Sequence, residues 1–310
     1  MVEQVEDIRD KQRKYNAHLA VMGERNSYSK TDPDATFMRM KEDPMKNGQL
    51  KPAYNLQLAV QSEYIVGLGV FPNPTDTRTL IPFLTAMESR YGRLAEHIVA
   101  DAGYDSEENM DWLRKKGSTA CIKPRDEDYR KTNKFKKHIG YRENMTYNAA
   151  SDTYTCAKGR ALHFVKETKQ HSKAGGYERT IRIYQCENCR HCGKRKQCQP
   201  TRTGTTPKQN KTIQSNPYYE SLVARDCDFI HSEKGIRLRI NRSIQIEGAF
   251  GTVKGNYAYR RVRYKGKESV EKELLFMAFG FNMRKYRSRR TNNRLQKHYL
   301  EKEETHTVAC

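Results

Sequence analysis

The fold is decided by the stretch HIVADAGYD at residues 97–105. Its first four residues predict a short buried strand, which ends in the carboxylate of Asp101 and turns at Gly103. A helix is predicted next at residues 107–116, followed by a second short strand at residues 120–123. Strand, helix and strand in this order predict an α/β sheet with Asp101 at the carboxyl edge of one strand.

Two β-rich runs upstream of that stretch predict an antiparallel hairpin. They cover residues 54–60 and 64–70, separated by three residues. Residues 76–91 then carry apolar side chains at helical spacing. Before the hairpin we expect a polar helix at residues 2–24 and a loop at residues 27–47, where Asp-Pro pairs interrupt regular structure. The whole region therefore predicts a mixed sheet with flanking helices.

Three further helices are predicted downstream, at residues 218–233, 240–254 and 270–284. In the last of them, the side chains expected to face the core are Leu274, Leu275, Met277, Ala278 and Phe281. Between the α/β pattern and these helices, residues 125–215 are rich in lysine and contain five cysteines. We interpret this segment as an insertion into the α/β domain.

The charge of the chain indicates a polyanionic partner. Lys and Arg number 58 against 37 Asp and Glu, which gives a net charge of +21. Such an excess repels itself in a compact protein, whereas binding to phosphates releases counterions. We therefore expect a nucleic acid as partner; a ribosomal or merely basic protein is the alternative.

The sequence also bears on location. No run approaches the ~20 apolar residues of a membrane-spanning helix, and residues 1–14 are charged throughout, unlike a signal peptide. Eight cysteines without a secretion signal indicate reduced thiols or metal ligands rather than disulfides. We expect a cytoplasmic protein with no membrane partner.

Two carboxylates stand where phosphodiester chemistry needs them. Such chemistry requires an activated nucleophile and a stabilised leaving oxygen, which two divalent ions ~3.5–4 Å apart provide when carboxylates hold them. Asp101 is predicted at a sheet edge. Glu247 lies on the apolar face of a predicted helix, with Lys254 seven residues further along the same face. From the residues alone, Asp101 as a turn-former and Glu247 as a half-buried ion-pair partner remain alternatives.

The motifs around these residues resemble those of the DDE transposases of bacterial insertion sequences. Residues 101–105 (DAGYD) are similar to the second-Asp motif of that family, and residues 247–254 (EGAFGTVK) to its last-helix motif, in which Glu and Lys are separated by six residues. Residues 54–60 and 73–76 match segments between the first two acidic positions. The resemblance covers about residues 30–285.

This resemblance implies an RNase H-like fold and a metal-dependent enzyme that cleaves and transfers DNA strands. Asp101 and Glu247 would bind Mg²⁺ or Mn²⁺, Lys254 would contact a phosphate, and the partners would be double-stranded DNA of transposon ends and target, with a homodimer as the working form. The implied division of the chain is a linker helix at 1–30, a first catalytic part at 31–124, the basic Cys-rich insertion at 125–215, the last catalytic helices at 216–290 and a polar tail at 291–310.

The chain departs from the family pattern in two places. The family's first catalytic Asp sits in a strand resembling Asp-Gly-Thr-Lys, which this sequence lacks; we expect such a strand upstream of residue 1, behind a DNA-binding domain. Asp32 and Asp34 are the candidates to replace that carboxylate, although their segment predicts a turn. Arg242 lies one residue away from the position of the family's arginine, and no Tyr fits, so we do not predict a phosphate-binding arginine there.

The cysteines of the insertion have the spacing of metal ligands. Two thiolates at C-x2-C spacing chelate one Zn²⁺, and a second pair completes a tetrahedron. The candidate ligands are Cys156, Cys186, Cys189, Cys192 and Cys198, with His191 nearby in sequence. We predict a structural zinc site that orders this core-poor segment, while free thiols in a loop are the alternative. Cys121 and Cys227 are interpreted as small core residues.

Basic residues follow the predicted Glu247 helix. Residues 257–265 alternate tyrosines with cations, a composition suited to phosphates and to stacking on unpaired bases. The predicted DNA contacts are Arg260, Arg261, Arg263 and Lys265. A solvated loop is the alternative, and the basic run at residues 284–294 is less specific.

Three functions remain open at this point. The first is an active transposase. The second is a catalytically inactive, N-terminally truncated transposase remnant that only binds DNA, which the missing first Asp strand motivates. The third is a zinc-stabilised RNA- or DNA-binding protein unrelated to transposition, for which the cysteines would matter and Asp101 would not.

Overall fold

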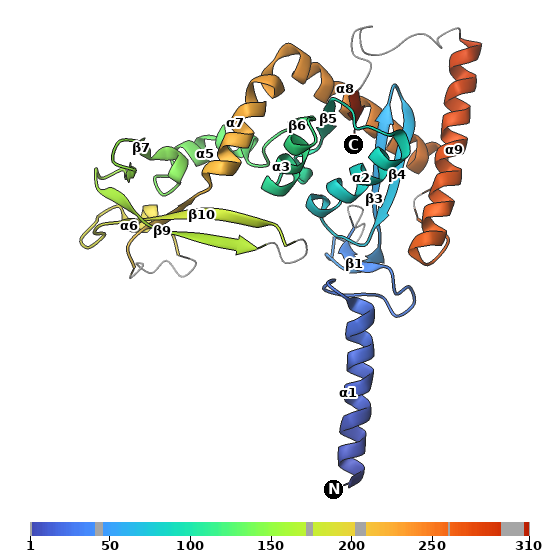
Figure 1. Ribbon diagram of the computed structural model, residues 1–310, viewed down its shortest axis with the longest axis horizontal. Coiled ribbons are helices and arrows are strands. Elements are labelled where there is room, and N and C mark those ends of the chain that lie inside the picture. The colour runs from blue at the N-terminus through green and yellow to red at the C-terminus, as the bar shows by residue number, and fades with distance from the viewer. Residues whose placement is uncertain are drawn as a thin grey trace. The chain divides into compact units, whose positions relative to one another are not determined.

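The computed structural model describes residues 2–40, 46–171, 176–201, 209–259, 261–292 and 307–309. The chain divides into two compact units (Figure 1). Unit 1 comprises Met1–Ile122 and Phe229–Cys310, and unit 2 comprises Lys123–Asp228. Each unit has a five-stranded sheet of its own. The protein is therefore built from both helices and sheets, as the sequence predicted.

The sheet of unit 1 is mixed. Its strands lie in the order β4-β3-β12-β5-β6. They span Asn55–Gln61 (β3), Tyr64–Phe71 (β4), His97–Ala100 (β5), Thr119–Ile122 (β6) and Thr307–Ala309 (β12). The predicted hairpin is the antiparallel pair β3–β4, and the two short strands around the predicted helix form the parallel pair β5–β6. A parallel pair leaves the carboxyl ends of both strands at one edge of the sheet.

The middle strand of this sheet comes from residues 291–310, which were expected to form only a polar tail. β12 pairs in parallel with β5 over Thr307–Ala309, and Ala309 pairs with Val60 of the antiparallel β3. Residues close to the end of the sequence thus join two strands that lie early in it. Three residues are too few to show the two-residue period of a strand, so the sequence could not reveal this pairing.

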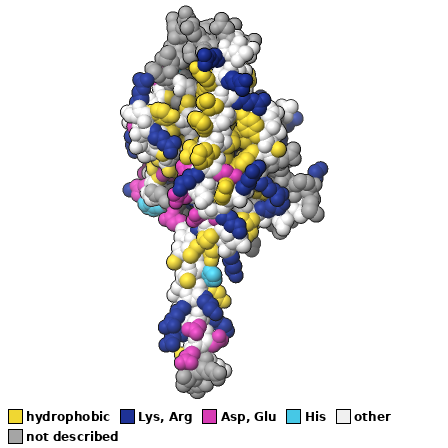
Figure 2. Space-filling view, turned by 90° about the vertical axis from the view of Figure 1, so that its right-hand side faces the viewer, with side chains coloured by type: hydrophobic (Ala, Val, Ile, Leu, Met, Phe, Trp, Pro, Cys, Tyr) yellow, Lys and Arg dark blue, Asp and Glu magenta, His cyan; other side chains and the backbone are white. Residues whose placement is uncertain are grey.

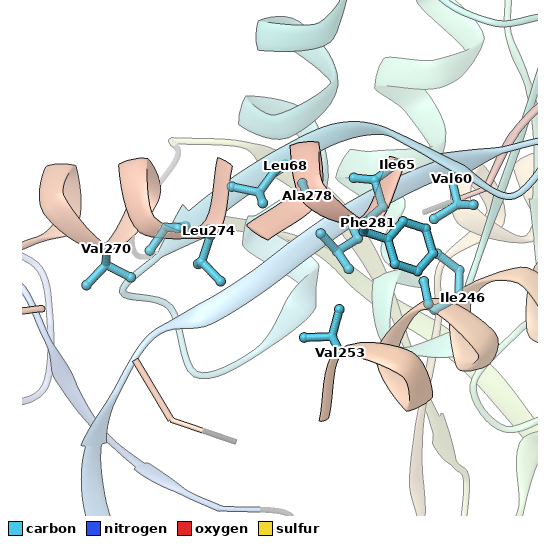
Figure 3. Packing of buried hydrophobic residues seen from close by; sticks show 12 residues of the cluster. Val60, Ile65, Leu68, Ile246, Val253, Val270, Leu274, Ala278 and Phe281 are labelled. Carbon is cyan, nitrogen blue, oxygen red and sulfur yellow. The ribbon is translucent and has the colours of Figure 1, made fainter. Parts of the chain in front are cut away.

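One face of the β3–β4 hairpin is covered by two helices, α8 (Glu233–Gly251) and α9 (Lys267–Thr291) (Figure 3). Their apolar side chains meet those of the strands in one buried cluster. Its members are Leu58, Val60, Ile65, Leu68, Val70, Ile246, Ala249, Val253, Val270, Leu274, Ala278 and Phe281. Asn282 adds a polar tie, because its side-chain amide bonds both the N–H and the C=O of Ile65, at 2.9 and 2.8 Å.

The opposite face of β4 carries α2 (Leu80–Tyr91), which buries Leu80, Phe83, Leu84 and Met87. Two glycines of β4 allow this approach. A Cβ at Gly67 would lie 2.8 Å from the Met87 sulfur, and one at Gly69 would lie 3.0 Å from the Phe83 ring. Glycine is needed here because the helix comes too close for any side chain. α3 (Glu107–Lys115) packs against β6.

The first part of unit 1 contains α1 (Val2–Met22), close to the predicted polar helix. The predicted loop at residues 27–47 is only partly a loop, because β1 (Thr36–Arg39) pairs with β2 (Leu50–Ala53) in a separate two-stranded sheet. Asp-Pro pairs masked this hairpin in the sequence. No helix within the described ranges is long and apolar enough to cross a membrane.

α9 exposes an apolar stripe on the side that faces away from the sheet. Leu275, predicted to face the core, is 41% exposed, whereas Leu274 and Phe281 are buried. The exposed stripe consists of Leu275, Phe276, Phe279, Met283 and Tyr286. Figure 2 shows the side of the molecule that α9 forms, where hydrophobic side chains gather among Lys and Arg.

Unit 2 contains an antiparallel sheet that the sequence did not predict, in the order β11-β10-β9-β8-β7. The strands span Thr146–Asn148 (β7), Thr153–Thr155 (β8), Ala161–His171 (β9), Glu178–Cys186 (β10) and Thr212–Ser215 (β11). Short helices surround them, at Glu127–Arg130 (α4), Asn133–Lys136 (α5) and Arg195–Cys198 (α6), and α7 (Pro217–His231) leads the chain back to unit 1. Most of β9 is exposed on both faces, so it lacks the apolar alternation by which strands are recognised.

Candidate functional site

Asp101 lies directly after β5, at the carboxyl edge of the parallel pair. Its side chain accepts a hydrogen bond of 2.6 Å from the N–H of Ala102 and caps the short helix η2 (Ala102–Tyr104). The side chain is 63% exposed. The carboxylate therefore helps to form the turn and still has an oxygen open to solvent, so the turn-forming and the functional interpretation are compatible.

The loop that carries Asp101 rests on a hydrogen-bonded group behind it. Asp76, at the start of η1 (Asp76–Arg78), accepts hydrogen bonds from Asn55 at 2.7 Å and from Gln57 at 3.3 Å. The hydroxyl of Tyr104 in turn donates to Gln57. A Cβ at Gly103 would lie only 3.0 Å from the Asp76 carboxylate. Asn55, Gln57 and Asp76 belong to residues 54–60 and 73–76, the two segments that resembled the transposase family without a known role. In the structure these segments position the turn after Asp101.

Arg242, for which the sequence predicted no phosphate-binding role, lies near Asp101 in the structure. It extends from α8, and its guanidinium Nη2 lies 3.8 Å from Oδ2 of Asp101. Arg242 shares a helical stripe with Leu238, Ile246 and Ala249, which are buried against the sheet. Spacing along α8 from these core positions would have predicted its direction, whereas comparison with a family motif did not.

Glu247 and Lys254 are both exposed and follow each other along one helical run. Glu247 is five residues beyond Arg242, which is a rise of about 7.5 Å along the helix. The expectation that Lys254 lies on the same face as Glu247 assumed a continuous α-helix. Instead α8 ends at Gly251, and Lys254 belongs to the wider π-helical turn η4 (Thr252–Asn256). Such turns rotate the following side chains and are frequent at functional sites.

Asp32 and Asp34, the candidates for a first carboxylate, both accept hydrogen bonds that hold local structure. Asp32 is buried and accepts from the Tyr54 hydroxyl at 2.8 and 2.9 Å and from the N–H of Gly266 at 3.1 Å. Asp34 accepts from the N–H of Lys267 at 2.8 Å. Burial, and then the neighbouring Asp32, raise the pKa of Tyr54 well above its usual range. These contacts fit two carboxylates that fasten the turn before β1 to the start of α9.

The side chains of Asp101 and Glu247 are of the type that binds Mg²⁺, but few such side chains come together in this structure. Exposed carboxylate oxygens are ligands that Mg²⁺ prefers, and one or two of them suffice when water and substrate phosphates complete the shell. Within the described ranges, no three His, Cys, Asp or Glu side chains form a group that could hold a metal ion. Asp101 and Glu247 are both exposed. Glu247 lies about 140° around α8 from Arg242, and the described residues do not bring the two carboxylates together with a third.

The basic loop between η4 and α9 is partly tied down. Arg260 lies outside the described residues, whereas Arg261, Arg263 and Lys265 are exposed. The N–H of Arg263 donates to both carboxylate oxygens of Glu273, at 3.2 and 3.1 Å. Three of the predicted DNA-binding cations are therefore exposed on a loop that is held to α9 by the hydrogen bonds between Arg263 and Glu273.

The tyrosines of this loop differ from one another. Tyr257 and Tyr259 pack against the core cluster, and burial, followed by Glu273, raises the pKa of Tyr259. Tyr264 is 61% exposed. Of these three rings, only that of Tyr264 is open for stacking on a base.

In unit 2, one cavity of about 30 Å³ is lined by cysteines. All five predicted ligands lie on it, namely Cys156, Cys186, Cys189, Cys192 and Cys198. Burial raises the pKa of Cys186 to about 12. Burial also raises the pKa of Cys198, Lys211 opposes that change, and the thiols of Cys156, Cys189 and Cys192 add to it. The cysteines that the sequence placed together are therefore neighbours in space. Cys121, by contrast, is a core residue of unit 1, as predicted.

Comparison with known proteins finds a family model that is similar to part of the chain. The family model described as "Transposase DDE domain" matches residues 155–287. The match includes Glu247, Lys254 and the cysteine segment, whereas Asp101 precedes it. No curated protein and no solved structure matches the chain. Residues 155–287 are therefore similar to the DDE domain of transposases, in agreement with the resemblance found in the sequence.

Proposed function

We propose that this chain is the transposase of an insertion sequence, an RNase H-like enzyme that cuts double-stranded DNA at transposon ends and joins the freed 3′-hydroxyl to target DNA. The observation that carries the proposal is an exposed carboxylate, Asp101, at the carboxyl edge of a parallel strand pair, with Arg242 of α8 3.8 Å away. Ligands of open α/β sheets bind at this edge. Nicking of supercoiled plasmid tests the function without knowledge of the terminal sequences.

In this proposal the protein side chains bind, orient and neutralise. Asp101 and Glu247 would hold Mg²⁺ or Mn²⁺, which would supply Lewis acidity for the attacking and leaving oxygens. Arg242 keeps the Asp101 carboxylate oriented and offsets negative charge brought in by DNA. Lys254 contacts a backbone phosphate as a point charge. The nucleophiles are water and then a DNA 3′-hydroxyl, so no covalent link between protein and DNA forms.

A second candidate function is a DNA-binding remnant without catalysis. It is favoured by one observation, namely that the described residues assemble no group of three potential metal ligands. This candidate predicts full DNA binding with no strand cleavage under any divalent ion. The zinc-stabilised nucleic-acid-binding protein unrelated to transposition is the weaker alternative, since the family match covers both Glu247 and the cysteines.

DNA binding should depend on the exposed cations of the loop before α9. Removing one cation that binds a phosphate should reduce the slope of log K against log salt by about 1, so Arg261→Ala, Arg263→Ala and Lys265→Ala together should reduce it by about 3. The measurement is fluorescence anisotropy of a labelled duplex over a salt series. Lys169→Ala is the matched control, because Lys169 is an exposed cation paired with Glu178 at 2.7 Å in unit 2. An unchanged slope in the triple variant would show that this loop does not touch DNA.

We further propose that two copies associate through α9. The exposed residues Phe276, Phe279, Met283 and Tyr286 follow one another at intervals of three, four and three, the spacing of a coiled-coil seam. The start of the helix carries three glutamates (Glu268, Glu271 and Glu273) with two lysines (Lys267 and Lys272), and its end exposes three arginines (Arg284, Arg287 and Arg290). An antiparallel second copy would place the acidic start of one helix beside the basic end of the other.

Sedimentation velocity tests this association. The parent chain should sediment as a dimer at micromolar concentration, and the double variant Phe276→Ser with Phe279→Ser as a monomer with unchanged circular dichroism. Val165→Ser, at a position in unit 2 that is 51% exposed, should remain dimeric. A parent chain that is monomeric at every concentration would refute the proposal, and so would a double variant that still dimerises.

A further inference from the structure

The cysteine cavity of unit 2 has no role in the proposed DNA chemistry. Its cysteines come from three parts of the chain, namely the turn between β8 and β9, the end of β10 with the segment after it, and α6. Its volume of about 30 Å³ exceeds that needed for a single water-sized occupant. Five sulfur atoms facing one small cavity are far more than a hydrophobic core requires, and thiolate sulfur is the preferred ligand of zinc and other soft cations.

The five thiols lie close to one another but differ in burial. Cys198 lies within electrostatic reach of the thiols of Cys156, Cys189 and Cys192. Cys186 also lies within electrostatic reach of Cys156 and Cys189, but it is 2% exposed in the apolar cluster of unit 2, and its thiol donates to the C=O of Asn188 at 3.6 Å. Cys186 is the most deeply buried of the five and is therefore interpreted as a small core residue, which leaves the other four thiols as candidate ligands.

The backbone around the four thiols is held in place by hydrogen bonds. Cys156 begins a tight turn in which its C=O accepts from the N–H of Gly159 at 2.8 Å and its N–H donates to the C=O of Arg160 at 2.9 Å. Gly159 has a φ of +76°, which favours glycine.

The segment that carries the other thiols is fixed in the same way. The C=O of Cys189 accepts from Arg195 at 3.1 Å. The sulfur of Cys189 accepts from the N–H of Lys211 at 3.3 Å. Backbone N–H groups that point at sulfur stabilise a thiolate, as hydrogen bonds to metal ligands generally do.

We propose that unit 2 binds one Zn²⁺ through Cys156, Cys189, Cys192 and Cys198, with Cys186 as a core residue. Cys189 and Cys192 form the chelating C-x2-C pair, and Cys156 and Cys198 complete the tetrahedron. Binding releases the four thiol protons to solvent as the Zn–S bonds form. Among the described residues the thiols do not form a metal-holding group as they stand, so binding requires their sulfur atoms to move closer together.

The site explains how a polar segment keeps a fixed structure. The apolar cluster of unit 2 consists of Met145, Tyr154, Leu162, Tyr184, Cys186, Cys189 and Ile213, with Cys156 packed against it. Most of β9 is exposed on both faces. A bound ion would join the turn after β8 to the segment after β10, and its binding free energy would add directly to the stability of the unit.

Metal analysis of the full chain, purified under reducing conditions without chelator, tests the ligand set. We expect one zinc per chain in the parent. Cys156→Ala and Cys198→Ala should each lose nearly all of it, whereas the matched control Cys186→Ala should retain it. Zinc lost from Cys186→Ala but kept by Cys198→Ala would overturn the assignment. A parent without zinc, even after incubation with the ion and desalting, would overturn the site itself.

Misfolding would also remove zinc from a variant, so the parent chain needs a direct readout of its ligands. Cobalt substituted for zinc should show the intense visible bands of tetrahedral coordination and a near-ultraviolet sulfur-to-cobalt charge-transfer band of four thiolates. Cys186→Ala should give the same spectrum. A band intensity corresponding to two thiolates, or octahedral cobalt, would contradict the proposal. So would a disulfide among these cysteines in the protein from the reducing preparation. Neither outcome depends on DNA cleavage.

Discussion

Asp101→Asn should lower the rate of DNA strand cleavage by more than about a hundredfold, because an amide cannot replace a charged oxygen ligand of a divalent ion. Loss of a residue that only hydrogen-bonds to a metal ligand already costs about ten- to a hundredfold in activity. DNA affinity should stay close to that of the parent. The side chain is 63% exposed, so the substitution should not unfold unit 1. Glu247→Gln should behave in the same way.

The controls for this prediction are exposed carboxylates elsewhere. Asp128→Asn removes a carboxylate that is 77% exposed beside Lys123, and Glu268→Gln removes one that is 83% exposed beside Lys272. Both variants should cleave like the parent. Rates are measured as nicked plasmid formed over time at saturating protein. If Asp101→Asn cleaves at the parent rate, Asp101 is only the residue that caps η2.

Phe281→Ala should lower the free energy of unfolding of unit 1 by about 3–5 kcal/mol. Phe281 is 5% exposed and lies among Val60, Ile65 and Ile246, where α8 and α9 meet the hairpin (Figure 3). Removing the ring leaves a cavity between two helices and a sheet, none of which can close it without breaking other contacts. Trp112, the single tryptophan, lies in α3 of unit 1, so its fluorescence during urea unfolding reports this unit alone.

Phe276→Ala is the matched control on the same helix. Phe276 is 78% exposed, so its removal should change the free energy of unfolding by no more than about 0.5 kcal/mol. Because Phe276 belongs to the proposed dimer seam, the comparison is made at several protein concentrations, where loss of association appears as a concentration dependence. Equal destabilisation by the two variants would mean that α9 does not pack on the sheet through Phe281.

Local patterns predicted the parts of the fold that obey them. The hairpin at residues 54–70 consists of two β-rich runs, and α2 carries Phe83, Leu84 and Met87 at helical spacing, so both were predicted. The sheet of unit 2 was missed because β9 has few buried side chains on either face. β12 was missed because three residues carry no period, and its partners β3 and β5 lie more than two hundred residues away in the sequence.

The site shows the same division between local and long-range information. A carboxylate after a short apolar strand was enough to predict Asp101 at a sheet edge, and the spacing of the cysteines was enough to predict that they meet. The contact between Arg242 and Asp101 was not predicted, since it depends on how α8 crosses the sheet. The change of helix type at Thr252 is likewise invisible in the residue pattern. The choice of Cys186 as the core residue among the five thiols required knowledge of which cysteine is most deeply buried.

The most direct test of the proposed function is whether the parent chain itself nicks supercoiled plasmid when Mn²⁺ is present. We predict relaxed circular product that forms with Mn²⁺ or Mg²⁺, is abolished by chelation, and is absent with Asp101→Asn. A gel shift run in parallel shows that DNA is bound in every sample. If the parent chain binds the plasmid fully and leaves it supercoiled with both ions, the claim of a metal-dependent nuclease is contradicted, and the DNA-binding remnant is the function that stands.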